Sequence, residues 1–268
     1  LNAGAGTVSL VTPAPGTSGI GTAGANILTT AGNITAAAGS GGVFITESDG
    51  ASFTATAAGA GQISLTSTAG TLTVAGATST GSGAVTLSSG DAIAVNANVG
   101  GAGSSLITIN TNTDGSGPDS FTMNAGGSIT TTNATANAVR LNVNTAAGGT
   151  GGATLGSITT GSGGAITVAT DTGGNATGGS ITQTAGTLLN VGTGSVTLQT
   201  GGAASGIGAA ATNILTTAGS ISASTGTGGV FITETDGGLI PESARGPHTT
   251  VLVPVGATRT VEFVADNP

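Results

Sequence analysis

The sequence has 268 residues, of which 52 are glycine, while 5% are charged and 2% are aromatic. Its formal net charge of −8 excludes a basic face for nucleic acid, because binding to the phosphate backbone requires clustered Lys and Arg. The sequence has no cysteine, which excludes disulfides and thiolate chemistry, and no apolar run reaches the roughly 18 residues needed to span a bilayer.

Short segments of alternating apolar and polar residues recur along the chain. This period-2 pattern predicts strands with one buried face. In chain order the clearest segments are VSL (8–10), ISL (63–65), LTV (72–74), VTL (85–87), IAV (93–95), ITI (107–109), FTM (121–123), ITV (166–168) and VTL (196–198). Because Gly interrupts every stretch that could show helical spacing, we predict an all-β fold without long helices.

The spacing of these segments predicts how the strands are connected. Four apolar positions follow one another at a constant interval, namely Ile63, Val85, Ile107 and Ile129. A coil of about 20–22 residues with two or three short strands is typical of a parallel β-helix (a β-solenoid), in which each strand stacks on its equivalent about 4.8 Å away. Longer corner loops are expected at 144–156 and 170–179.

The composition changes near residue 238. The segment GLIPESARGPHTT (238–250) contains two Pro and the only His, and residues 251–265 have the pattern of two strands around a turn. We therefore divide the chain into a β-solenoid region, residues 1–237, and a Pro-containing β-strand tail, residues 238–268, that acts as a cap, a linker or a contact element. Because the sequence begins inside the repeat pattern, we expect it to be part of a longer secreted chain.

One segment of the sequence is duplicated. GGVFITESDG (41–50) recurs as GGVFITETDG (228–237), and the match extends without a gap over residues 17–50 and 204–237, with 24 of 34 positions identical. Duplication at a fixed offset is a signature of repeat architecture.

Each copy contains three consecutive apolar residues, which are Val43, Phe44 and Ile45 in the first copy and Val230, Phe231 and Ile232 in the second. A strand sends neighbouring side chains to opposite faces, so either the Phe or its two neighbours must point away from the core. An apolar side chain on the outside of so polar a rod suggests a covered surface. We predict that these six are contact residues that pack against the tail or a neighbouring molecule; the alternative is a strand buried under its own loop.

The segments AGNITAAAGSGGVFIT (31–46), GAVTLSSGDAIAVNANV (83–99) and GSITQTAGTLLNVGTGSVTLQT (179–200) resemble the repeats of filamentous-haemagglutinin-type proteins. These are large bacterial adhesins exported by two-partner secretion, and related β-strand-repeat surface proteins look similar. The resemblance covers about residues 1–237. It implies a right-handed parallel β-helix on the bacterial cell surface.

Several acidic residues invite a search for chemistry. Five aspartates lie beside or close to Gly or Ser, namely Asp49, Asp114, Asp119, Asp171 and Asp236. Calcium needs six to eight clustered oxygen ligands, and the calcium-binding nonapeptide of β-rolls is absent, so we expect these residues to form turns. Asp114 and Asp119 are the nearest approach to a carboxylate pair for sugar hydrolysis, but no basic residue accompanies them. His248 has no nucleophile beside it. We expect no enzyme activity, metal or cofactor.

Together these features predict a structural protein that is secreted to the cell surface and forms a rigid rod or a filament subunit. Its expected partner is itself, through end-to-end or lateral contacts, with no nucleic acid and no membrane span. An adhesin stalk that binds host or matrix glycans through a loop within 144–179 is the second hypothesis, and a polysaccharide-active β-helix enzyme is the third.

Overall fold

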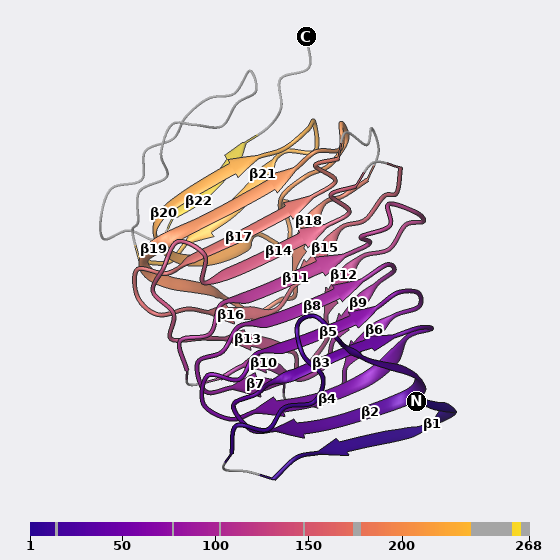
Figure 1. Cartoon of the computed structure of the whole chain (residues 1–268). Coiled ribbons are helices and arrows are strands. Elements are labelled where there is room, and N and C mark those ends of the chain that lie inside the picture. Colours follow the sequence, from indigo (N-terminus) through magenta and orange to yellow (C-terminus); the bar gives the residue numbers. More distant parts are fainter. Residues whose placement is uncertain are drawn as a thin grey trace.

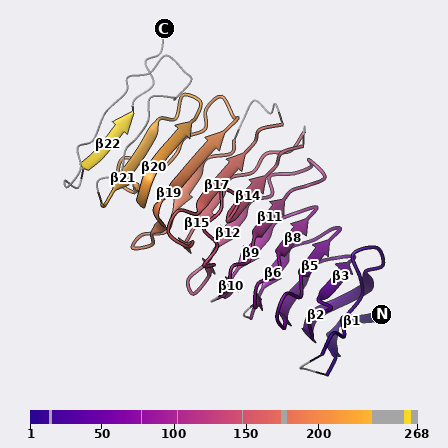
Figure 2. The same ribbon diagram turned by 60° about the vertical axis from the view of Figure 1, so that its left-hand side comes forward.

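The computed structural model describes residues 1–13, 16–76, 78–101, 103–146, 148–173 and 178–236, and the backbone of 259–263. Within these ranges the chain is all-β, with no helix and therefore none that could cross a membrane. The strands form one large open sheet that stacks from the N-terminal to the C-terminal end of the chain (Figures 1 and 2).

Three parallel ladders organise the strands, and we number them by the order in which the chain visits them. The first ladder contains β3 (Val43–Glu47), β5 (Ile63–Ser67), β8 (Val85–Ser89), β11 (Ile107–Thr111), β14 (Val139–Val143), β17 (Ala165–Thr170) and the later parts of β19 (Leu189–Thr200) and β20 (Ile214–Ser224). Every pairing in this ladder is parallel, so main-chain hydrogen bonds run along the stack.

The other two ladders consist of shorter strands. The second contains β4 (Ala51–Ala57), β6 (Leu72–Val74), β9 (Ile93–Val95), β12 (Phe121–Met123), β15 (Ala153–Leu155) and β18 (Ile181–Gln183). The third contains the end of β4, β7 (Ser79–Thr80), β10 (Asn98–Gly100), β13 (Ser128–Thr130), β16 (Ser157–Thr159) and the start of β19.

The stack ends differently at its two sides. At the N-terminal side, β1 (Asn2–Val11) pairs in parallel with β2 (Ile27–Ala38), and β2 pairs with both β3 and β4. At the C-terminal side, β20 pairs in parallel with β21 (Val230–Glu234), and β22 (Arg259–Phe263) pairs with β21 in the antiparallel direction.

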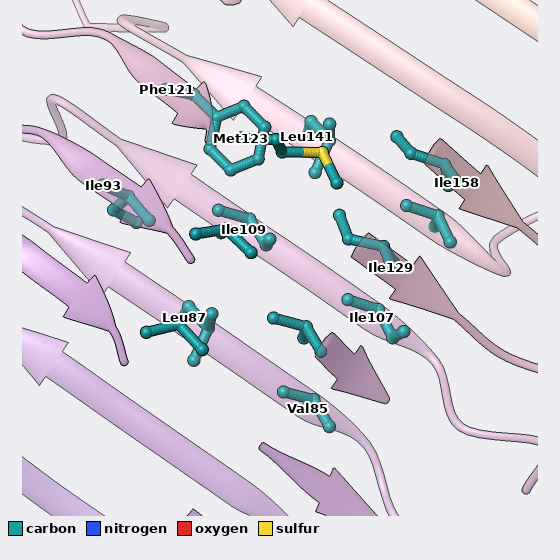
Figure 3. Close-up of a cluster of buried hydrophobic side chains, with 14 of the residues drawn as sticks. Val85, Leu87, Ile93, Ile107, Ile109, Phe121, Met123, Ile129, Leu141 and Ile158 are labelled. Atoms are coloured by element: carbon teal, nitrogen blue, oxygen red, sulfur yellow. The ribbon is translucent and has the colours of Figure 1, made fainter. Parts of the chain in front are cut away.

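Aliphatic side chains of equivalent strands stack in columns inside the molecule. Alternate residues of the first-ladder strands are fully buried, as the period-2 pattern predicts. Figure 3 shows part of this core, where Leu87, Ile109 and Leu141 lie in register on β8, β11 and β14, and Phe121 and Met123 of β12 fill the space beside them. The residues between them, such as Thr86, point outward and are only partly buried. The pattern of alternation thus decides which residues form the core.

The predicted coil length is correct only for the first rungs. Val85 pairs with Ile107, as the constant interval predicts, but Ile107 pairs with Val139 across a distinctly longer coil. Ile129, which the spacing placed in this ladder, pairs with Ile158 in the third ladder. The reason is physical: corner segments that lie outside the ladders can lengthen without breaking a main-chain hydrogen bond.

One corner of the stack is built from Asn and Asp in the left-handed backbone region. Asn112, Asn144 and Asp171 have φ values of 54°, 50° and 53°, and each directly follows a strand of the first ladder. The backbone amide of Asn144 donates to Thr111 O, and that of Asp171 donates to Val143 O. Because Asn and Asp tolerate this conformation better than other non-Gly residues, the chain turns here without breaking the ladder.

The ladder predicts that inward and outward neighbours on one strand differ sharply in their contribution to stability. Leu87→Ala should lower the free energy of unfolding by about 2–5 kcal/mol, because it removes a side chain packed between Leu65 and Ile109. Thr86→Ala, one residue away but outward, should change it by less than about 0.5 kcal/mol. Urea unfolding followed by far-UV circular dichroism measures both; similar losses in the two variants would contradict this description of the core.

Candidate contact surface

The six predicted contact residues lie on β3 and β21. Val43 and Ile45 are fully buried in the core, so Phe44 lies on the opposite face of β3, where it is 8% exposed. The conflict posed by three consecutive apolar residues is therefore resolved by directing Phe44 outward and covering it.

The connection between β1 and β2 pairs with the start of β3 through the main chain. Ile20 N donates to Gly42 O, and Phe44 N donates to Ile20 O, both over 2.8 Å. Gly19 approaches Gly41 so closely that a Cβ on Gly19 would lie 2.8 Å from the Gly41 carbonyl carbon. In Figure 1 this connection, drawn in indigo, passes over β3. The first copy thus pairs with its own loop, and a contact of Phe44 with a neighbouring molecule stays a prediction.

The second copy repeats this arrangement. Phe231 N donates to Ile207 O over 2.7 Å, and Ile207 N donates to Gly229 O over 3.0 Å. Val230 and Ile232 are buried, whereas Phe231 is partly exposed. The free edge of β21 is occupied by β22, which belongs to the predicted tail; apart from the backbone of 259–263, the tail lies outside the described residues, as does His248.

The two copies lie on different ladders. β3 pairs with β5 in the first ladder. By contrast, Ile207, which bridges to Val230 of β21, also bridges to Ile181 of the second ladder. The same sequence therefore adopts the same local fold on two different sides of the stack, which shows that contacts within the segment determine its structure.

The structural repeat extends further back than the gapless alignment. β1 pairs with β2 with two register shifts, and β19 pairs with β20 with shifts at the equivalent places. In both pairs the shifts surround a glycine, Gly4 opposite Ala31 and Gly192 opposite Ala218. The sequences of the two segments also match, since LNAGAGTVSL (1–10) aligns with LNVGTGSVTL (189–198). The first copy has one extra residue between this segment and the gapless match that begins at Thr17. We call this unit the end module: β1–β2–β3 in one copy and β19–β20–β21 in the other.

Each end module contains a fully buried glutamate that the sequence analysis missed. Glu47 accepts hydrogen bonds from Thr29 Oγ1 (2.5 Å), from Ala31 N (3.1 Å) and from Ser48 N (3.0 Å). Glu234 accepts the equivalent bonds from Thr216 Oγ1 (2.7 Å), Ala218 N (3.3 Å) and Thr235 N (2.9 Å). Alternation along VFITE could have revealed both, because each Glu shares the inward parity of the Val and Ile.

The surroundings shift the pKa values of the two glutamates in opposite directions. Burial raises the pKa of Glu47, but hydrogen bonds from Thr29, Asp49, Ala31 and Ser48 lower it more, so the pKa lies below its usual value. The hydrogen bond shared with Glu47 raises the pKa of Asp49. For Glu234, burial followed by the hydrogen bond with Asp236 raises the pKa more than Thr216 and the main-chain amides lower it. Each end module therefore pairs two carboxyl groups that can share a proton.

The other aspartates of the described ranges do not gather into a metal-binding cluster. Asp114 is exposed and accepts from Ser116 N and Ser116 Oγ, both over 3.0 Å, which is a turn arrangement. Burial, with Asp91 and Asp114 nearby, raises the pKa of Asp119. Asp171 is buried at the corner described above and accepts from Asn144 Nδ2. Across the described residues, no three His, Cys, Asp or Glu side chains lie close enough to hold a metal ion.

Comparison with known proteins found no matching family model, no matching curated protein and no matching solved structure.

The opposite pKa shifts predict opposite pH dependences for two matched substitutions. Because the pKa of Glu47 is lowered in the folded state, its stabilising effect is present above the ordinary pKa of 4.5 and is lost as the pH falls. Glu47→Gln should therefore reduce the free energy of unfolding more at pH 7 than at pH 3. Because the pKa of Glu234 is raised in the folded state, its stabilising effect is present below pH 4.5 and is lost as the pH rises. Glu234→Gln should therefore reduce the free energy of unfolding less at pH 7 than at pH 3.

Local amide exchange can separate these two effects within one chain. The amide of Ala31 reports on the first module and that of Ala218 on the second, since each donates to its glutamate. Protection of the two amides should respond to pH in opposite directions in the two variants. Parallel responses would contradict the assignment.

Proposed function

We propose that this chain is a structural protein without enzyme activity, a rigid extracellular rod in the form of a right-handed parallel β-helix. In this role it serves on the bacterial cell surface as a rod or as the subunit of a filament. Its stiffness would come from main-chain hydrogen bonds that run along the long axis in three ladders.

The observation that carries the proposal is the continuity of the first ladder. From β3 to β20, each strand pairs in parallel with the next, and the first two inward residues of each strand form continuous apolar columns. The outward residues of the same strands are mostly Ser, Thr and Asn. A chain built in this way has a continuous core along its length and a surface without charged clusters, which suits a mechanical role better than binding a small substrate.

The resemblance of residues 1–237 to filamentous-haemagglutinin-type repeats supports export and a location on the cell surface. The absence of cysteine and the low charge of the sequence are compatible with that location.

A second candidate function, an adhesin stalk for surface or matrix glycans, is favoured by the lengthened corner after β14 and β17. Loops from two successive rungs meet there: a Cβ on Gly173 would lie 2.5 Å from Ala146 O. Stacked loops give a ridge along the rod that could present residues of 144–179 to a receptor.

Electron microscopy of the 268-residue chain over a hundredfold range of concentration tests the proposal. We expect rods of uniform width with a repeat of about 4.8 Å along the axis, detectable by diffraction from aligned material. Substitution of the partly exposed Phe231 by Ser tests the contact residues, since reduced end-to-end or lateral association is expected if it mediates contacts. Compact, isotropic particles at every concentration would contradict the rod.

A further inference from the structure

The corner that follows the first-ladder strands contains side-chain oxygens that lack a hydrogen-bond partner. Thr111 Oγ1, Asn112 Oδ1 and Asn144 Oδ1 are buried, and none of the three has a partner in the part of the chain that the structure describes. Burying an oxygen without a hydrogen bond is costly, and protein interiors rarely leave one unsatisfied. Three such atoms in one corner indicate that a ligand contacts them.

The backbone explains why these polar side chains lie inside the molecule. Neighbouring side chains alternate along a strand, yet Asn112 is as buried as Thr111, the last inward residue of β11. The left-handed conformation of Asn112 interrupts the alternation, so that two successive side chains are buried. Asn144 and Asp171 have the same conformation at the equivalent place on the next two rungs, and both are buried.

The bonds of the two amide groups determine which atom is left without a partner. Asn112 Nδ2 donates to Gly117 O over 3.3 Å. Asn144 Nδ2 donates to Gly149 O over 2.7 Å and to the carboxylate of Asp171. Carbonyl and carboxylate oxygens accept hydrogen bonds, so these positions require the NH₂ group and exclude the flipped amide. The unpartnered atom of each amide is therefore an oxygen.

The spacing of the rungs allows one ion to contact both amide oxygens. Each amide donates to the carbonyl of the residue five positions further along, so the side chains of Asn112 and Asn144 are oriented alike. Equivalent atoms on successive rungs lie about 4.8 Å apart. A calcium–oxygen contact is about 2.3–2.6 Å long, so an ion midway between the two oxygens contacts both. Thr111 Oγ1 lies beside them, one residue away on the same inner side.

A cation fits these atoms better than a water molecule does. The three unpartnered atoms are all oxygens, and a water molecule has only two hydrogens to donate. Amide, hydroxyl and main-chain carbonyl oxygens are ligands of calcium, as are carboxylates. The buried Asp171, which is bonded to Asn144, places a negative charge one rung away.

We propose that this corner binds one calcium ion through the side-chain oxygens of Thr111, Asn112 and Asn144. The carboxylate of Asp171 supplies the counter-charge, and the loop carbonyls that accept from the two amides lie beside the site and complete the coordination. The ion links β11, β14 and β17 at the corner that carries the long loops. The expectation of no metal came from a search for clustered aspartates, whereas these three ligands are neutral.

Urea unfolding of the 268-residue chain tests the proposal with calcium alone as the probe. With a single carboxylate nearby, we expect a dissociation constant of about 1 mM, as in extracellular calcium modules. About 10 mM calcium chloride should then lower the unfolding equilibrium constant about tenfold relative to EGTA at equal ionic strength. Magnesium at the same concentration should have a much smaller effect, because it gives up its water ligands reluctantly.

Matched variants locate the effect. Asn112→Gly and Asn144→Gly each remove one ligand oxygen and keep a residue that tolerates positive φ, so each should abolish the response to calcium. Asp114→Asn removes the exposed carboxylate of the adjacent turn and should leave the response unchanged. Should the glycine variants fail to fold, Asn112→Asp still tests the site, since the added charge should lower the dissociation constant at least fivefold.

Side-chain NMR signals report on the site directly. The NH₂ resonances of Asn112 and Asn144 should shift saturably with calcium, whereas those of Asn96 and Asn124, which bond to each other on the second ladder, should not. An unfolding equilibrium that ignores calcium, an equal response in Asn112→Gly, or loss of the response in Asp114→Asn would overturn the proposal. So would crystals grown with calcium that show only a water molecule between the two amide oxygens. These outcomes are independent of whether the chain forms rods.

Discussion

The main-chain hydrogen bond between successive parallel strands is the constraint on which the rest of this structure depends. Each residue of the first ladder is held to an equivalent residue one rung away, so an inward side chain is stacked on inward side chains. The core is therefore a set of columns, and its composition can be plain: Val, Ile and Leu fill the first ladder without aromatic anchors. Buried aromatic side chains lie elsewhere: Phe121 stacks in register in the shorter second ladder, and Phe44 lies on the outer face of β3.

The end modules show that local interactions can override the position of a segment in the stack. Both modules contain the same register shifts and a buried glutamate that bonds back to an earlier rung, yet they lie on different ladders. A buried carboxylate is costly unless it is hydrogen-bonded, and here each one accepts at least three hydrogen bonds. We infer that Glu47 and Glu234 specify how the chain crosses from one strand to the next within the module. What differs between the copies is the neighbour: β3 is followed by parallel β5, and β21 by antiparallel β22.

The sequence was informative wherever alternation alone determines the answer. It predicted strands at 63–65, 85–87 and 107–109 and their mutual register, because side-chain direction in a strand has a strict period of two, and the all-β fold without long helices holds for the described residues. It could not predict that Ile107 pairs with Val139, because the extra residues of this coil lie in corner segments that pair with no ladder strand and leave no mark in the alternation. It also treated the aspartates as the notable acidic residues and overlooked Glu47, although Val43, Ile45 and Glu47 share one parity. The correspondence between β1 and β19 could not be predicted, because it became visible only from their shared register shifts, after a one-residue offset in the alignment.

The central claim is that main-chain pairing along the ladders holds the molecule together, and native-state amide exchange measured by NMR tests it most directly. The amides of Ser195, Thr197 and Gln199, which face β17, should exchange slowly. Their counterparts Thr7, Ser9 and Val11 lie on β1, which pairs only with β2 among the described residues, and their amides should exchange at rates near those of an unstructured chain. Equal protection of the two sets would contradict the claim, because the two sets of residues differ in whether a parallel strand covers their edge.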